Sequence, residues 1–132
     1  MSNAVRVLVV QDEALICSFI EDALSDGGLA ACSVHSGEAL STFRDGRERC
    51  RALLTDINLG GGISGWELAR QIREITPGFP VLYMTSASAP DWKSQGVDGS
   101  VLIEKPFAPA QLAAAVSQLL DTGASPGDPG SL

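Results

Sequence analysis

Four side chains with reactive or charged groups each follow a short apolar segment of the sequence. Asp12, Asp56, Thr85 and Lys105 come just after the largely apolar runs 5–10, 52–55, 81–84 and 101–103, respectively. Together they supply two carboxylates, a hydroxyl group and an ammonium group. A carboxylate that directly follows a buried segment is costly to bury unless it is paired or bound to a cation. Asp56 is therefore the strongest single candidate for a functional residue.

Each of the other three side chains has a simpler explanation when it is taken alone. Asp12 could equally cap the helix that follows it. Thr85 could satisfy a backbone group of a loop, and Lys105 could be a solvated surface side chain. What favours a shared site is that all four groups occur at the ends of successive apolar segments.

Apolar runs of strand length alternate along the chain with segments of helical periodicity. Strands are predicted at 5–10, 29–34, 52–55, 81–84 and 101–103. In the first helix, adjacent apolar pairs recur every four residues from Leu15/Ile16 onward, which predicts an apolar stripe. Ser36 is the predicted N-cap of the second helix, and Pro109 the predicted first residue of the last.

This alternation predicts an α/β fold with a single, doubly wound, five-stranded parallel sheet and helices on both faces. The functional crevice of such a sheet lies beyond the carboxyl ends of its strands, where the four side chains above are expected to meet. The fourth helix is expected to be short or irregular, because residues 86–100 contain one proline and two glycines and show little periodicity. Residues 1–120 are expected to form the domain, and 121–132 a disordered tail or linker remnant.

Composition narrows the classes of function. Nine basic against sixteen acidic side chains give a net charge of −7, which argues against nucleic acid as a partner. No apolar stretch approaches the roughly 18–20 residues that span a bilayer, so we expect no membrane contact by this domain. Three cysteines without a CxxC spacing indicate reduced thiols and a cytoplasmic location.

The four groups suit the transfer of a phosphoryl group to a carboxylate. Carboxylates form aspartyl-phosphate intermediates, and the charge of the phosphoryl group can be neutralised by Mg²⁺ together with a lysine. Mg²⁺ takes oxygen ligands and needs only one or two carboxylates besides phosphate oxygens and water. Asp12 and Asp56 could provide these carboxylates.

The motifs resemble those of a response-regulator receiver domain of bacterial two-component phosphorelay signalling. The matching segments are 7–13 (VLVVQDE), 54–59 (LTDINL), 65–68 (GWEL), 84–86 (MTS) and 104–107 (EKPF). They occur in the order typical of the family and cover about residues 5–120. The resemblance implies the strand order 2-1-3-4-5 of flavodoxin-like sheets.

The resemblance also implies a role for each matching position. Asp56 would accept a phosphoryl group from a phosphohistidine on a histidine kinase or a histidine phosphotransfer protein. Thr85 and Lys105 would contact the phosphoryl oxygens and transmit the change to a partner protein. Mg²⁺ would be held by Asp12, Asp56 and the backbone carbonyl of Asn58, with Gln11 contributing weakly through a water molecule.

Two of the departures from the family pattern concern metal binding and switching. Receivers usually carry two adjacent acids after the first strand, but the first of these is Gln11 here, so we expect weaker binding of Mg²⁺. The aromatic residue that usually lies three positions before the lysine is Leu102, which puts the usual aromatic switch in doubt. Both departures leave open a pseudo-receiver, a protein-interaction domain that works without phosphorylation.

An enzyme is not expected beyond the domain's assistance to its own phosphorylation and dephosphorylation. Hydrolases that use an aspartyl-phosphate carry an acid two residues after the nucleophile, whereas this chain has Asn58, which cannot shuttle a proton. The chain could be a stand-alone receiver or a piece of a larger protein. The glycines at 60–62 and the reduced fourth helix favour a receiver attached to a hybrid histidine kinase.

Overall fold

The computed structural model describes residues 5–46, 50–59, 63–85, 95–105 and 107–123. Its five strands form one parallel sheet in the order β2-β1-β3-β4-β5, which confirms the predicted fold class. The strands are β1 (Arg6–Val10), β2 (Ala30–Val34), β3 (Cys50–Asp56), β4 (Val81–Thr85) and β5 (Val101–Glu104). Every residue of β4 is buried, as are all but the first of β1, as expected for strands covered on both faces.

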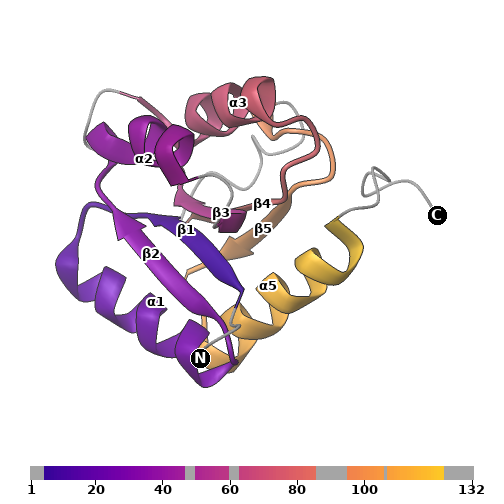
Figure 1. Ribbon diagram of the computed structural model, residues 1–132. Coiled ribbons are helices and arrows are strands. Elements are labelled where there is room, and N and C mark those ends of the chain that lie inside the picture. Colours follow the sequence, from indigo (N-terminus) through magenta and orange to yellow (C-terminus); the bar gives the residue numbers. More distant parts are fainter. Residues whose placement is uncertain (1–4, 47–49, 60–62, 86–94, 106, 124–132) are drawn as a thin grey trace.

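Helices cover both faces of this sheet (Figure 1). They are α1 (Ala14–Asp26), α2 (Ala39–Gly46), α3 (Gly65–Ile75) and α5 (Pro109–Gly123), with a 3₁₀ turn, η1 (Ser36–Glu38), before α2. One apolar core lies between the sheet and α1 with α5, and a second lies between the sheet and α2 with α3. In the second core the rings of Phe43 and Phe79 meet edge to face at 5.0 Å. The sheet is thus packed on both faces, and this packing positions its strand ends.

The outer part of α1 differs from the predicted apolar stripe. Ile20 and Leu24 are buried as predicted, but Leu15 is 87% exposed and Phe19 39% exposed. Successive residues of a helix point about 100° apart, so the two members of the outer pairs Leu15/Ile16 and Phe19/Ile20 differ in exposure, whereas both members of the pair Ala23/Leu24 are buried. The first members of two of these pairs therefore face outward, near the carboxyl edge of the sheet.

The last helix begins where the sequence predicts and extends further than expected. Pro109 opens α5 as predicted, and this helix continues to Gly123, three residues past the expected domain boundary. The expectations about the loop at 60–62, about most of the fourth helix (86–94) and about the tail from residue 124 lie outside the described residues.

Candidate phosphoacceptor site

The carboxyl ends of three neighbouring strands place the predicted residues together. Asp56 is the last residue of β3, Thr85 is the last of β4, and Lys105 directly follows β5. The backbone links these ends, because Lys105 N–H donates to the Thr85 carbonyl oxygen at 2.8 Å and Ile57 N–H donates to that of Met84 at 3.1 Å. The strand register therefore fixes the spacing of a buried carboxylate, a buried hydroxyl group and a lysine.

Asp56 is buried, and two side chains donate to one of its oxygens. The Lys105 ammonium nitrogen lies 3.0 Å from Oδ2, and Gln11 Nε2 donates to the same oxygen at 3.2 Å. Gln11 is itself held in place, because its Oε1 accepts from the backbone N–H of Glu13 at 3.1 Å. These contacts offset the cost of burying the carboxylate.

Asp12 makes a different set of contacts. Its Oδ1 accepts from the backbone N–H of Ser36 at 2.9 Å, and its Oδ2 accepts from the Ser36 hydroxyl at 3.0 Å. Nδ1 of His35 lies 3.8 Å from Oδ1. Asp12 thus binds the start of η1, which belongs to the connection between β2 and α2.

The predicted N-cap at Ser36 is wrong, and Asp12 is not the N-cap residue of α1. That residue is Glu13, whose own side chain makes no capping hydrogen bond. Ser36 lies inside η1 after the N-cap residue His35, and its hydroxyl donates to Asp12. The Ser36 hydroxyl binds a carboxylate 24 residues away in the chain, and a local capping pattern cannot reveal such a contact.

Gly65 has a structural role beside Asp56 that the sequence does not reveal. A Cβ atom there would lie 2.3 Å from the carbonyl oxygen of Asp56 and 2.9 Å from Cα of Ile57. The Gly65 N–H donates to the carbonyl oxygen of Ile57 at 2.8 Å. Only glycine allows α3 to start this close to the end of β3, so Gly65 helps to position Asp56.

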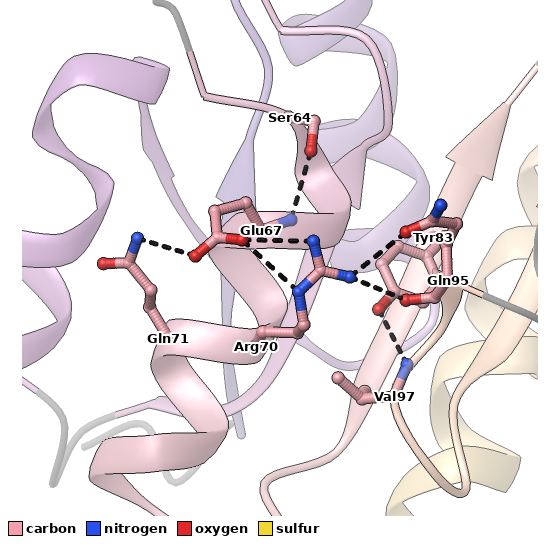
Figure 2. Close-up of polar contacts among 7 residues, drawn as sticks. All are labelled: Ser64, Glu67, Arg70, Gln71, Tyr83, Gln95 and Val97. Atoms are coloured by element: carbon pink, nitrogen blue, oxygen red, sulfur yellow. Dashed lines mark hydrogen bonds and ion pairs between the residues drawn. The ribbon is translucent and has the colours of Figure 1, made fainter.

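A polar network joins α3 to the segment before β5 (Figure 2). The Arg70 guanidinium contacts Glu67 at 3.1 Å and donates to the backbone oxygen of Gln95 at 3.2 Å. In the same segment before β5, Val97 N–H donates to the hydroxyl oxygen of the buried Tyr83 at 3.1 Å.

Tyr83 lies two residues before Thr85 on β4 and packs against Trp66, with 4.6 Å between the ring centroids. Its register partner on β5 is Leu102, so the buried aromatic ring beside the site belongs to β4. Burial raises the pKa of the Tyr83 hydroxyl above its ordinary value, more than the Val97 N–H and the charge of Arg73 lower it. The hydroxyl therefore stays protonated at neutral pH.

Comparison with known proteins identifies the class that this sheet and site define. Residues 7–117 match the response regulator receiver domain family. The chain therefore belongs to the receiver domains of two-component signalling, as the sequence motifs predict.

Individual relatives agree with this assignment. The crystal structure of a response regulator receiver protein from Sinorhizobium medicae superposes with a TM-score of 0.81 at 36% identity, covering 92% of this chain and 98% of that one. Response regulator MprA of Mycobacterium bovis is 30% identical over 120 residues, which are 89% of this chain and 51% of MprA. Transcriptional regulatory protein TcrA of Mycobacterium tuberculosis is 30% identical over 129 residues, 96% of this chain and 50% of TcrA. The chain thus spans about half the length of these two relatives.

The donor atoms of the site suit Mg²⁺, the ion that the family implies. Asp12 and Asp56 offer carboxylate oxygens, and Asn58 follows Asp56 by two residues in an exposed position. Within the described ranges no group of three or more His, Cys, Asp and Glu side chains forms a metal cluster. Mg²⁺ does not need one, because it keeps several waters and binds through one or two carboxylates. None of the helices in the same ranges is long and apolar enough to cross a membrane.

Proposed function

We propose that the domain is a phosphoacceptor module in which Asp56 takes a phosphoryl group from a phosphohistidine. A carboxylate oxygen of Asp56 forms the new bond to phosphorus, while the bond between phosphorus and the donor's imidazole nitrogen breaks. The imidazole leaves with the electron pair of that bond, so the step needs no further reactant. The phosphohistidine would belong to a histidine kinase or a histidine phosphotransfer protein, as the family assignment supports.

The single observation that carries this proposal is the 3.0 Å contact between Lys105 and a buried Asp56 carboxylate at the strand ends. Lys105 is positioned to shift from the carboxylate to an oxygen of the incoming phosphoryl group, whose charge it would neutralise. Thr85, at the end of the next strand, would donate its hydroxyl to a second phosphoryl oxygen. These contacts at the ends of β4 and β5 would make the phosphorylated state detectable to a partner protein.

Mg²⁺ would be held by Asp12, Asp56 and the backbone carbonyl of Asn58, with Gln11 in contact through a water molecule. When bound, the ion supplies positive charge that neutralises the phosphoryl oxygens. Gln11 and Lys105 keep the Asp56 carboxylate in place before the donor arrives, and burial of Asp56 keeps bulk water from most of its surface.

The remaining features fit a domain that works through protein contacts. Its net charge of −7 opposes binding to nucleic acid by this domain, although one of the relatives is named as a transcriptional regulator. A cytoplasmic location follows from the proposed exchange with kinases of two-component systems.

The test is the intact mass of the protein after incubation with acetyl phosphate or phosphoramidate, with and without Mg²⁺, beside the variant Asp56→Asn. The proposal expects one Mg²⁺-dependent phosphoryl adduct that is labile at alkaline pH and absent from the variant. Absence of an adduct with both donors, together with no binding of Mg²⁺, would overturn it.

That second result would favour a pseudo-receiver. The contact between Gln11 and Asp56 is consistent with this alternative. Gln11 and Lys105 both donate to Oδ2 of Asp56, so two protein groups already contact this oxygen without a metal ion. If the domain is a pseudo-receiver, the wild-type protein and the variant Asp56→Asn should bind the partner protein equally well.

A further inference from the structure

The contact between Asp12 and Ser36 uses both oxygens of a carboxylate that the proposed function assigns to the metal ion. Ser36 donates its N–H to Oδ1 and its hydroxyl to Oδ2, at 2.9 and 3.0 Å. Ser36 is buried, whereas the Asp12 side chain is 30% exposed. The surrounding residues therefore hold the donor in place, while the acceptor remains accessible to solvent. Such a pair of hydrogen bonds to a charged group is stronger than bonds between neutral groups.

We propose that Ser36 is a positioning residue that holds the Asp12 carboxylate at the start of η1 and competes with Mg²⁺ for it. This inference rests on the proposed function, because it requires Asp12 to be a metal ligand. Each Asp12 oxygen already accepts one hydrogen bond from Ser36, which leaves it one lone pair fewer for a cation. A cation bound to either oxygen also withdraws electron density from it, so we expect Mg²⁺ binding through Asp12 to weaken a contact with Ser36.

The same contact links the metal site to the connection between β2 and α2. Asp12 supplies the acceptor for the first N–H of η1, because the side chain of the N-cap residue His35 does not cap this turn. Withdrawal of Asp12 leaves this N–H without its carboxylate partner. By linkage, whatever strengthens the contact between Asp12 and η1 weakens Mg²⁺ binding by the same factor, and the reverse also holds.

Calorimetric titration with MgCl₂ tests the competition. In Ser36→Ala the backbone donor remains and only the hydroxyl is lost, so Mg²⁺ should bind about two- to tenfold more tightly than to the wild type. Ser36→Thr keeps a hydroxyl group and should restore the affinity of the wild type. The matched control is Ser41→Ala, because the exposed Ser41 donates to the backbone oxygen of Glu38 and should leave the Mg²⁺ affinity unchanged.

A second measurement uses the unmodified protein. The NMR signal of the Ser36 backbone amide should move on addition of MgCl₂ toward its position in Asp12→Ala, where the acceptor is missing. This result does not depend on whether Ser36→Ala folds. A merely structural role for Ser36 would lower stability in the variant without tightening Mg²⁺ binding.

The outcomes separate this inference from the proposed function. If the wild type binds Mg²⁺ through Asp12 and is phosphorylated, but Ser36→Ala has unchanged or weaker affinity and the Ser36 amide signal stays in place, the competition is refuted while the function stands. If the wild type shows neither Mg²⁺ binding nor an adduct, the proposed function fails and the inference fails with it. Tighter binding in Ser36→Ala, with recovery in Ser36→Thr, supports both.

Discussion

Gln11 and Asp56, which are 45 residues apart in the chain, are joined by a hydrogen bond of 3.2 Å from Nε2 to Oδ2. A neutral amide thus lies beside the proposed phosphoacceptor, at a position where most receivers carry an acid. An acid at this position would repel Asp56 unless a cation lay between the two carboxylates. The amide instead stabilises Asp56 in the absence of a metal ion. As a consequence, the site has one negative charge fewer to attract Mg²⁺.

The variant Gln11→Glu should therefore bind Mg²⁺ more tightly and be less stable without it. Loss of the hydrogen bond and the added repulsion should lower the free energy of unfolding by about 1–3 kcal/mol in a chelator. Saturating Mg²⁺ should recover most of this loss, because the cation binds only the folded site. Urea unfolding with and without MgCl₂ measures both effects, and unchanged Mg²⁺ affinity would contradict the expectation.

Removal of the Lys105 ammonium group should slow phosphorylation more than it affects the metal ion. In Lys105→Met we expect adduct formation from acetyl phosphate to fall by about tenfold or more, since one preorganised charge at the reacting group is lost. Mg²⁺ should still bind at least as tightly, because the positive charge beside Asp56 is gone. Arg44→Met changes the net charge equally at an exposed position of α2 and serves as the control. Equal adduct rates in the two variants would show that Lys105 has no specific role.

Gly65→Ala should damage the site through the backbone. The added methyl group would collide with the carbonyl oxygen of Asp56, so the start of α3 and the end of β3 must move apart. We expect a loss of about 1–3 kcal/mol in the free energy of unfolding and a slower formation of the adduct. Gly37→Ala is the matched control, because a Cβ atom there meets no atom within 4 Å. A Gly65→Ala protein with normal stability and phosphorylation would show that the backbone approach is not required.

The sequence was sufficient to predict the sheet and the group of Asp56, Thr85 and Lys105. Apolar runs identify strands, and parallel strands end at one edge, so residues at the strand ends must meet. The contacts of Asp12 could not be predicted in this way, because they depend on where the connection after β2 returns to the sheet. Nor does periodicity show which member of an apolar pair faces outward, as the exposure of Leu15 demonstrates. The glycine at 65 is visible in the sequence, but its close approach to Asp56 exists only in three dimensions.

Tyr83 should make the protein sensitive to alkaline pH. A free tyrosine ionises near pH 10 in the unfolded chain, whereas burial keeps this hydroxyl protonated to higher pH in the folded state. The contribution of Tyr83 to stability is therefore intact below about pH 10 and is lost as the pH rises toward the folded pKa. The chain contains one tyrosine, so its absorbance reports this ionisation directly. Tyr83→Phe should flatten the alkaline decline above about pH 10, and an equally steep decline in this variant would contradict the assignment.

The thiols of Cys17 and Cys50 should add to this decline at somewhat lower pH. Burial is the largest cause that raises the pKa of both groups, so the unfolded chain releases their protons first. Their contribution begins near pH 8.5, the ordinary value of a cysteine, and is separate from that of Tyr83. In the double variant Cys17→Ser, Cys50→Ala, the free energy of unfolding should therefore fall less between about pH 8.5 and 10. The decline at higher pH that is due to Tyr83 should remain.

The exposed start of α1 should contribute to recognition of the protein that donates the phosphoryl group. Leu15 and Phe19 are the large apolar side chains that remain exposed among the described residues, and Leu15 is three residues from Asp12 at the site. A donor domain that brings its histidine to Asp56 would cover this end of α1. Leu15→Ala should therefore slow transfer from a phosphohistidine protein by about fivefold or more, while the rate with acetyl phosphate stays unchanged. Because Leu15 is 87% exposed, the free energy of unfolding should change by no more than about 0.5 kcal/mol. The control for transfer is Ser25→Ala, because Ser25 is exposed at the far end of α1. If Leu15→Ala lost the same rate with both donors, the damage would be to the site and not to an interface.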